Sequence, residues 1–394
     1  MDFKLSDRVQ RIKPSPTLAI TARAAELRAA GKDIIGLGAG EPDFDTPEHI
    51  KAAATKAIAD GFTKYTAVDG TATLKQAIID KLSRDNQLNY TANQVLVSCG
   101  GKQSFFNLTQ ALLNEGDEVI IPAPYWVSYP DMVLLADGKP VIVEADIKQS
   151  FKITPAQLED AITDKTRLLV LNSPSNPSGI AYSNNELVAL GQVLLKHPHV
   201  LVATDDMYEH ILWADEPFSN IVMACPELYE RCIVLNGVSK AYSMTGWRIG
   251  YAAGPENLIK AMKKIQSQST SNPTSISQVA AEAALNGDQS CVKTMLTAFQ
   301  ERHEYVNQRL NAIDGITCLP SDGTFYAFPD VSGFIDKIDG INDDMELSEY
   351  LIEKAGVALV PGTAFGSPGY IRISFATSIE VLKDALDRIE KVIS

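Results

Sequence analysis

A lone lysine, Lys240, lies within the stretch "NGVSKAYSMTGWRIGYAAG", directly after an apolar run that is typical of a strand. Ligands of open α/β sheets bind beyond the carboxyl ends of the strands. A lysine in a partly dry pocket there can lose its proton readily and act as a nucleophile or a base. Arg248 follows nearby, beside Trp247, as a second fixed cation. Taken singly, a solvated lysine and an ion-pairing arginine are the simpler interpretations.

Two further strand-like runs end in residues that could bind an anion. In "SCGGKQ", Gly100 and Gly101 stand between a strand and a helix, where backbone N–H groups can approach a phosphate. A tight turn explains these glycines equally well. In "LNSPSNPSG", Asn172 and Asn176 bring side-chain amides. For this segment alone, an ordinary turn is the simpler interpretation.

Acidic and basic side chains also follow or interrupt apolar runs. Asp205 opens the segment "DDMYEH", with Tyr208 three residues later. An acid at a buried strand end is costly unless it is paired, although a helix cap or a solvated acid explains it too. Arg372 interrupts the apolar run "YIRISFA" and could bind a carboxylate with both arms of its guanidinium. An edge arginine that reaches solvent is the alternative.

Other chemistries have little support in the sequence. The five histidines show no HExxH or other metal-binding spacing, and no GxSxG or GxxxxGK[ST] motif is present. The five cysteines are scattered without CxxC spacing, which argues against a disulfide framework or a zinc site. We therefore expect no metal and a reducing, cytoplasmic location.

Strand-like and helix-like segments alternate along most of the chain. From about residue 46 to 286, short Val- and Ile-rich runs without polar alternation indicate strands that are buried on both faces. Helix-start signals separate them: Thr46 before Pro47, and capping boxes that begin at Thr154 and Ser183. The pattern predicts an α/β domain with a mostly parallel sheet, spanning 46–286. Residues 287–394 indicate a smaller α+β domain, which the N-terminal segment 1–45 joins.

Composition limits the partners of this chain. Its 394 residues contain 35 Lys and Arg against 49 Asp and Glu, a net charge of −14. So acidic a surface disfavours nucleic acid and anionic membranes, and no apolar run approaches membrane-spanning length. A small anionic substrate stays compatible with this charge, because a local basic pocket can oppose it.

The motifs, taken together and in order, resemble the class I pyridoxal-phosphate-dependent aminotransferases of fold type I. The similarity is greatest to the bacterial aspartate aminotransferase branch and covers nearly the whole chain. It rests on "GEPDFDTPEHIK", "KYT", "GGKQ", "PYWVSYP", "NPSG", "DDMYEH", "SKAYSMTGWRIGY" and "VPGTAFG". The resemblance implies pyridoxal 5′-phosphate as cofactor, amino acids and 2-oxo acids as substrates, and a homodimer.

The resemblance also implies how the cofactor is held. Lys240 would join it as a Schiff base and, once displaced by substrate, would move a proton between the substrate's Cα and the cofactor. Asp205 would pair with the pyridine nitrogen, so that the ring stays an electron sink. The phenolic oxygen would be met by Tyr208 and Asn176, and the ring by Trp126. The phosphate would be bound by Arg248 and by the backbone at Gly101 and Lys102, with Ser239 in support and Tyr65 reaching it from the neighbouring subunit.

The implied substrate contacts centre on two cations. Arg372 would bind the α-carboxylate, helped by Gly40 and flanked by Trp126 and Asn176. Lys102 would meet the distal carboxylate of a dicarboxylic substrate. Lys13 is a further candidate for that task, as in relatives that accept prephenate. The chain departs from relatives at Gly237, where some have a phosphate-binding serine.

The function that these features favour is transfer of an amino group between L-aspartate and 2-oxoglutarate in a ping-pong cycle. Prephenate, alanine or an aromatic amino acid is the alternative substrate. A β-lyase or decarboxylase of the same fold would share Lys240 and Asp205. An effector-binding transcription regulator would need a basic DNA-binding extension, which the N-terminal sequence does not show.

Overall fold

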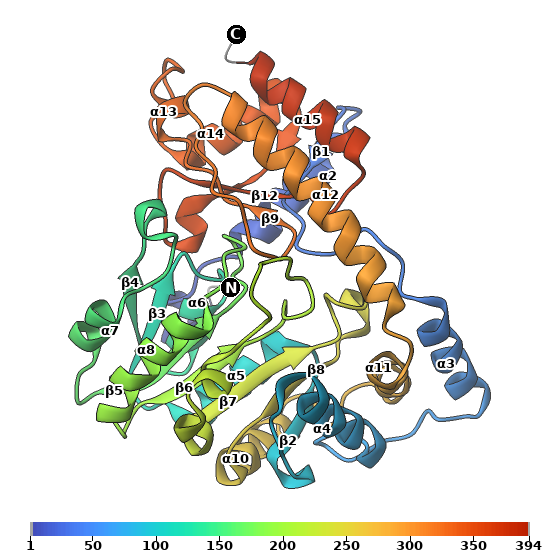
Figure 1. The fold of residues 1–394 in the computed structure, drawn as a ribbon. Coiled ribbons are helices and arrows are strands. Elements are labelled where there is room, and N and C mark those ends of the chain that lie inside the picture. Colours follow the sequence, from blue (N-terminus) through green and yellow to red (C-terminus); the bar gives the residue numbers. More distant parts are fainter. Residues whose placement is uncertain (1–2, 393–394) are drawn as a thin grey trace.

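The computed structural model describes residues 3–392, and within this range seven strands form one sheet (Figure 1). Their order is β2-β8-β7-β6-β5-β3-β4. The strands are β2 (Val95–Ser98), β3 (Glu118–Ala123), β4 (Lys139–Glu144), β5 (Thr166–Asn172), β6 (Leu201–Asp205), β7 (Cys232–Gly237) and β8 (Gly250–Ala253). All neighbours from β7 to β4 are parallel, whereas β8 runs antiparallel to both β2 and β7. The predicted, mostly parallel sheet is thus confirmed.

Helices cover both faces of this sheet. They are α3 (Glu48–Ala59), α4 (Ala72–Asn86), α5 (Gly101–Leu112), α6 (Tyr129–Leu135), α7 (Pro155–Ala161), α8 (Asn184–Lys196), α9 (Ile221–Ala224), α10 (Glu256–Ser267) and α11 (Ser275–Asn286). Side chains alternate between faces along a strand. Val95 and Val97 accordingly pack in the cluster with α4, α8 and α11, whereas Leu96 packs in the opposite cluster with α5, α6 and α10. Both faces of the central strands are dry, which explains their continuous apolar runs, whereas the edge strand β4 is partly exposed.

Two of the three predicted helix starts are confirmed. Thr154 and Ser183 form capping boxes with Gln157 and Glu186. The predicted cap at Thr46 is wrong, because α3 begins at Glu48 after Pro47 and the Thr46 side chain makes tertiary contacts instead. Its hydroxyl donates to the Ser243 carbonyl at 2.6 Å and accepts from the Trp247 indole at 2.9 Å.

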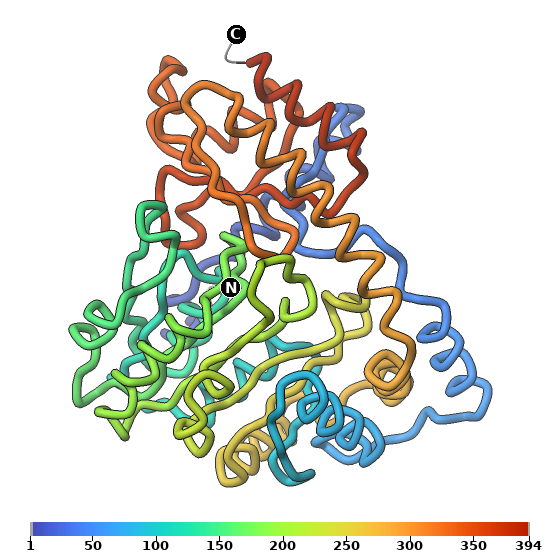
Figure 2. The backbone as a smooth tube through the Cα atoms, viewed as in Figure 1, coloured from blue at the N-terminus to red at the C-terminus, as the bar shows by residue number. Residues whose placement is uncertain are grey.

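Most of the remaining chain packs beyond the carboxyl ends of the parallel strands, where a blue segment around residue 35 lies beside the red C-terminal region (Figure 2). Strand β1 (Ile35–Gly36) pairs in parallel with β10 (Val357–Ala358). A second small sheet has the order β11-β12-β9. The other elements of this region are α2 (Pro16–Ala29), α12 (Ser290–Ala312), β9 (Tyr326–Ala327), α13 (Ser332–Ile335), α14 (Asp344–Tyr350), β11 (Val360–Pro361), β12 (Ile371–Ser374) and α15 (Ile379–Lys391). Helix α1 (Asp7–Gln10) instead lies near α6, where Arg8 and the adjacent Arg11 bond to Asp137. The domain limits at residues 46 and 287 stay a prediction.

Within residues 3–392, no helix is both long enough and apolar enough to span a lipid bilayer. The expected cytoplasmic location stays a prediction.

Candidate active site

A cavity of about 270 Å³ opens at the carboxyl ends of β5, β6 and β7 and is lined from the other side by β9 and β12. It gathers most of the residues that the sequence pointed to. Its lining includes Gly40, Gly101, Lys102, Trp126, Asn176, Asp205, Tyr208, Ser239, Lys240, Arg248 and Arg372. Parallel strands that end at one sheet edge bring these distant segments together.

Lys240 follows β7 by three residues, and its ammonium points into the cavity. Its Nζ donates a hydrogen bond to the carbonyl of Gly40. Burial, with the nearby Arg372 as the next cause, lowers the pKa of Lys240 to about 8. The side chain can therefore gain and lose a proton near neutral pH, as a nucleophile or base must.

Asp205 is the last residue of β6 and supplies a carboxylate to the same cavity. Its Oδ2 accepts a hydrogen bond from the Tyr129 hydroxyl at 2.5 Å, and its Oδ1 accepts one from the backbone N–H of Met207 at 3.3 Å. The adjacent strand fixes the backbone, since the Asn172 amide donates to the Asp205 carbonyl at 2.9 Å. Burial raises the pKa of Asp205. A cationic ligand atom beside it would favour the carboxylate form.

Arg248 and the glycines after β2 form a second side of the cavity. The Arg248 guanidinium donates to the carbonyls of Thr245 (2.8 Å) and Cys99 (3.4 Å). A Cβ on Gly100 would lie 2.2 Å from its Nη2, and Gly100 has a φ of +88°. Only glycine can both adopt this positive φ without strain and leave room for the guanidinium. The guanidinium thus lies against the start of α5, where helix N–H groups favour an anion.

Arg372 lies on β12 and is 2% exposed. Its Nη1 donates to Oδ1 of Asn176 at 2.9 Å, and its Nη2 donates to the carbonyl of Gly38 at 2.7 Å. Its Nε has no hydrogen-bond partner among the described residues. A buried guanidinium with a free donor is suited to a carboxylate ligand.

Lys102 lies at the start of α5, with its Nζ 5.1 Å from the centroid of the Trp126 ring. Partial burial, followed by the charge of Arg248, lowers the pKa of Lys102. The aromatic face holds the cation by its quadrupole. An anion near Lys102 would be favoured by both the ammonium and the helix start.

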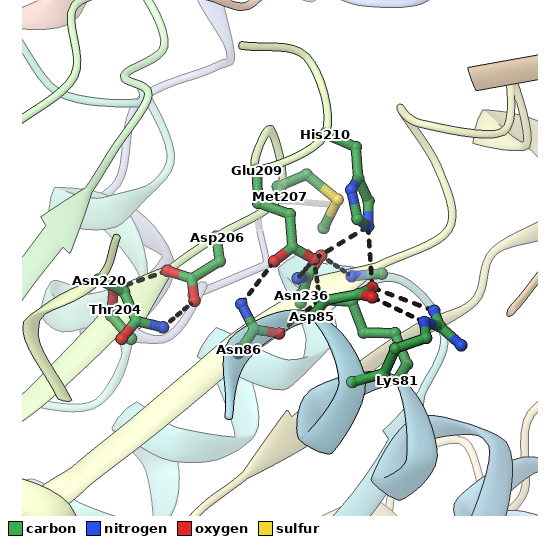
Figure 3. A network of polar contacts seen from close by, with 12 residues as sticks. Lys81, Asp85, Asn86, Thr204, Asp206, Met207, Glu209, His210, Asn220 and Asn236 are labelled. Atoms are coloured by element: carbon green, nitrogen blue, oxygen red, sulfur yellow. Dashed lines mark hydrogen bonds and ion pairs between the residues drawn. The ribbon is translucent and has the colours of Figure 1, made fainter. Parts of the chain in front are cut away.

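Behind the segment that carries Asp205 and Tyr208 lies a buried polar network (Figure 3). Glu209 contacts the ammonium of Lys81 and accepts hydrogen bonds from the amides of Asn236 (2.7 Å) and Asn86 (2.9 Å). Because Asn236 belongs to β7, the network joins the turn after β6 to the strand that leads to Lys240. Asp206 accepts from Thr204 (2.7 Å) and Asn220 (2.6 Å) in the same layer.

Known proteins resemble this chain over its whole length. A family model described as "Aminotransferase class I and II" matches residues 32–389. The chain belongs to this aminotransferase family. Among its relatives, the aspartate/prephenate aminotransferase of Nitrosomonas europaea is 62% identical over 397 residues, which cover 100% of each protein. The aspartate aminotransferase of Rhizobium meliloti is 51% identical, covering 98% of this chain and 95% of that protein.

Solved structures agree with this assignment. The aspartate aminotransferase structure from Rhizobium meliloti has a TM-score of 0.96 and 50% identity, covering 100% of this chain and 99% of that one. The Thermus thermophilus aspartate aminotransferase with maleate has a TM-score of 0.93 and 43% identity, covering 99% of this chain and 100% of that one. The fold of this aminotransferase is therefore that of the pyridoxal-phosphate enzymes of fold type I.

The residues of the cavity fit pyridoxal 5′-phosphate, the cofactor of this family. Lys240, Arg248 and Arg372 donate their described hydrogen bonds to carbonyl and amide oxygens rather than to carboxylates. Their positive charges are thus available to an anionic ligand. A phosphate suits Arg248 and the start of α5, an aldehyde suits the amine of Lys240, and a pyridinium suits Asp205.

Two predicted residues of the aminotransferase lie outside this cavity. Tyr65 is 92% exposed, and its role at a neighbouring subunit stays a prediction. Lys13 is exposed as well, although Ser15, Thr17 and Leu18 from the same segment line the cavity. The segment that carries Lys13 therefore approaches the site, whereas its side chain does not line it.

Sequence reasoning gave no role to two tyrosines of the aminotransferase site. Tyr129 contacts Asp205, and the Tyr326 hydroxyl lies 3.0 Å from that of Tyr208. Both occupy apolar stretches whose pattern indicates core residues. The motif "PYWVSYP" could have pointed to Tyr129, whereas nothing in "GTFYAF" distinguishes Tyr326 from its buried neighbours.

Proposed function

We propose that this aminotransferase moves the amino group between L-aspartate and 2-oxoglutarate, yielding oxaloacetate and L-glutamate, in a ping-pong cycle. The observation that carries the proposal is the meeting of Lys240 with two further cations, Arg372 and Lys102, in one cavity. An amino acid with two carboxylates can engage both cations. The names of the relatives, aspartate and aspartate/prephenate aminotransferase, support it.

The cofactor would be held by five groups. Arg248 and the backbone at Gly101 would bind the phosphate, Asp205 would hold the protonated ring nitrogen, and Lys240 would bind the aldehyde carbon. Tyr208 would donate to the phenolic oxygen. When bound, pyridoxal 5′-phosphate supplies an electron sink for the electrons that remain at the substrate's α-carbon.

On the substrate side, the chain's own groups orient and exchange protons. Arg372 would bind the α-carboxylate through its Nε, which has no partner among residues 3–392, and a remaining N–H of its guanidinium, and Lys102 would bind the distal carboxylate. With its pKa near 8, Lys240 Nζ can take a proton from the α-carbon and return it. The low exposure of Arg372 keeps water from competing for the carboxylate.

Half-reactions with a panel of amino-acid donors test this function. Purified enzyme with the cofactor is mixed with single amino acids, and the visible absorbance follows each half-reaction. We expect aspartate and glutamate to react fastest and Lys240→Ala to react with neither while keeping its circular dichroism. Normal turnover of Lys240→Ala, or a preference for monocarboxylic donors, would contradict the assignment.

Prephenate is the second candidate acceptor, because several relatives carry it in their names. It is also a dicarboxylate with a 2-oxo group, so the same two cations could bind it. Formation of arogenate from prephenate and glutamate, followed by chromatography, tests it directly.

We also propose that the functional unit is a homodimer in which Tyr65 reaches the cofactor phosphate of the neighbouring subunit. The large exposure of this aromatic residue supports the proposal, since exposed aromatic rings are enriched at interfaces.

A further inference from the structure

Tyr326 occupies the point where the cofactor side and the substrate side of the cavity meet. It lies on β9, opposite Ser374 of β12, and Arg372 stands two residues before Ser374. Residues two apart on a strand share a face, so Tyr326 and Arg372 are diagonal neighbours on one face of the small sheet. Tyr326 is fully buried and lines the cavity.

The hydroxyl of Tyr326 faces the cofactor side. It lies 3.0 Å from the hydroxyl of Tyr208, a residue that is 4% exposed. The Tyr326 hydroxyl also fills the space beside Gly40, because a Cβ atom added to Gly40 would lie 2.8 Å from the hydroxyl oxygen. Gly40 is the residue whose carbonyl accepts from Lys240. The phenol is thus fixed among groups that surround the reacting amine.

The ring of Tyr326 faces the substrate side. The guanidinium carbon of Arg372 lies 4.4 Å from its centroid, and Phe365 contacts the same guanidinium at 5.0 Å. An aromatic face attracts a cation and limits where it can move, more strongly in a dry site. The two in-plane partners of Arg372, Asn176 and Gly38, complete its placement.

We propose that Tyr326 is a positioning residue with two separable tasks: its hydroxyl supports the hydrogen bond that Tyr208 donates to the cofactor, and its ring holds Arg372 for the substrate carboxylate. This inference rests on the proposed function, since it concerns the same site. With Tyr208 donating to the ligand, the Tyr326 hydroxyl donates to the oxygen of Tyr208. A donor that itself accepts a hydrogen bond is strengthened.

The two tasks predict two different signatures. A hydrogen bond to the phenolic oxygen of the cofactor favours its proton-free form and so lowers the pH at which the visible absorbance changes. Tyr326→Phe removes the hydroxyl and keeps the ring. We expect it to raise that pH by about 0.1 to 0.6 unit, because the Tyr208 bond to the cofactor remains and only its cooperative strengthening of about 10–30% is lost. Tyr326→Leu also removes the ring, and we expect it to weaken binding at Arg372.

Maleate measures the second signature, because it is a dicarboxylate that cannot donate an amino group. Its Kd is obtained from the absorbance change of the cofactor-loaded enzyme. We expect Tyr326→Phe to stay within about twofold of the wild type and Tyr326→Leu to bind about 3- to 30-fold more weakly, the range of a desolvated cation–π contact.

Tyr182→Phe is the matched control. Its buried hydroxyl accepts one hydrogen bond, from the backbone N–H of Ile153 at 2.9 Å, and it does not line this cavity. It should lower the unfolding temperature without moving the absorbance pH or the Kd of maleate. The proposal is overturned if Tyr326→Phe leaves the pH of the absorbance change unmoved, or if Tyr182→Phe moves it by the same amount. This test does not depend on whether Tyr326→Leu folds. By contrast, failure of the proposed function would appear in the wild type, as no reaction with aspartate.

Discussion

The reactivity of Lys240 depends on its surroundings more than on its residue type. Its pKa is lowered to about 8 by burial and by the cation Arg372, whereas an exposed lysine titrates near 10.5. Only the neutral amine attacks an aldehyde. We therefore expect the rate at which cofactor-free enzyme takes up pyridoxal 5′-phosphate to rise with pH until about pH 8 and then to level off. Stopped-flow absorbance measures this rate.

Arg372→Gln provides the control for this pH profile. Removing a nearby cation makes protonation of Lys240 easier, so the plateau should move to higher pH. A wild-type rate that continues to rise well above pH 9, or a plateau that Arg372→Gln leaves unchanged, would show that the amine is solvated.

The role of Lys102 also concerns a single side chain, which would bind one carboxylate of the substrate. Lys102→Ala should raise KM for aspartate by roughly 10-fold and leave KM for alanine within about twofold, since only binding of the distal carboxylate is lost. Steady-state kinetics with both donors measures the split. An equal rise for both would mean that Lys102 serves the cofactor phosphate instead.

At the scale of elements, the sequence predicted what depends on local pattern. The strands before Asp205 and Lys240 are continuous apolar runs, so both residues could be assigned to strand ends and hence to one edge. The capping box at Ser183 was predictable because its partners lie three residues apart. The actual role of Thr46 was not predictable, because its hydroxyl forms hydrogen bonds with Trp247 and Ser243, about 200 residues away in the sequence. Tyr326 was missed for the same reason, since its hydroxyl partner Tyr208 is distant in sequence.

The turn after β6 depends on the buried pair of Glu209 and Lys81, whose side chains are 4% and 1% exposed. Glu209→Gln would leave the buried ammonium of Lys81 with only the more distant carboxylate of Asp85, at 4.0 Å, as a counter-charge. We expect it to lower the free energy of unfolding by about 3 kcal/mol in urea titrations. Lys81→Met combined with Glu209→Gln should recover part of that loss. Asp60→Asn, which removes the exposed pair with Lys56, is the control and should have little effect.

The same pair predicts how stability depends on pH. Burial by itself would raise the pKa of Glu209, but Lys81, His210 and the Asn86 hydrogen bond together lower it from 4.5 to about 2. Between these values the unfolded chain binds a proton that the folded chain does not, so stability falls as pH falls from 4.5 towards 2. The wild type should lose more stability than Glu209→Gln over this window. Parallel losses would show that Glu209 is not charged in the fold.

At the scale of the whole molecule, charge and topology act together. The chain carries a net charge of −14, yet its cavity gathers Lys102, Lys240, Arg248 and Arg372. Composition alone predicted that large polyanions are disfavoured, whereas only the fold places these cations together. The pairing of β1 with β10 likewise joins residues more than 300 positions apart and has no local signal in the sequence.

The proposed crossing of Tyr65 between subunits is a property of the assembly, and subunit mixing tests it. Tyr65 extends from a loop that the side chain of Gln278 holds in place. The side-chain amide of Gln278 donates to Thr66 Oγ1 at 3.0 Å and to the Pro273 carbonyl at 2.9 Å. The side-chain oxygen of Gln278 accepts a hydrogen bond from the Thr71 N–H at 2.8 Å. Tyr65→Ala should therefore weaken cofactor binding without unfolding the loop. Lys240→Ala abolishes covalent binding in its own site.

When these two variants are unfolded and refolded together, a hybrid dimer contains one site with Lys240 from one chain and Tyr65 from the other. If Tyr65 acts across the interface, that site is intact, and about a quarter of all sites in an equal mixture should bind pyridoxal 5′-phosphate with wild-type affinity. If Tyr65 acted within its own chain, no site of the hybrid would contain both residues. If Tyr65 had no role, Tyr65→Ala homodimers alone would bind the cofactor as tightly as the wild type. Titration at cofactor concentrations that leave Tyr65→Ala homodimers empty distinguishes the two cases, because only a tyrosine donated by the neighbouring chain can create tight sites from two defective parents.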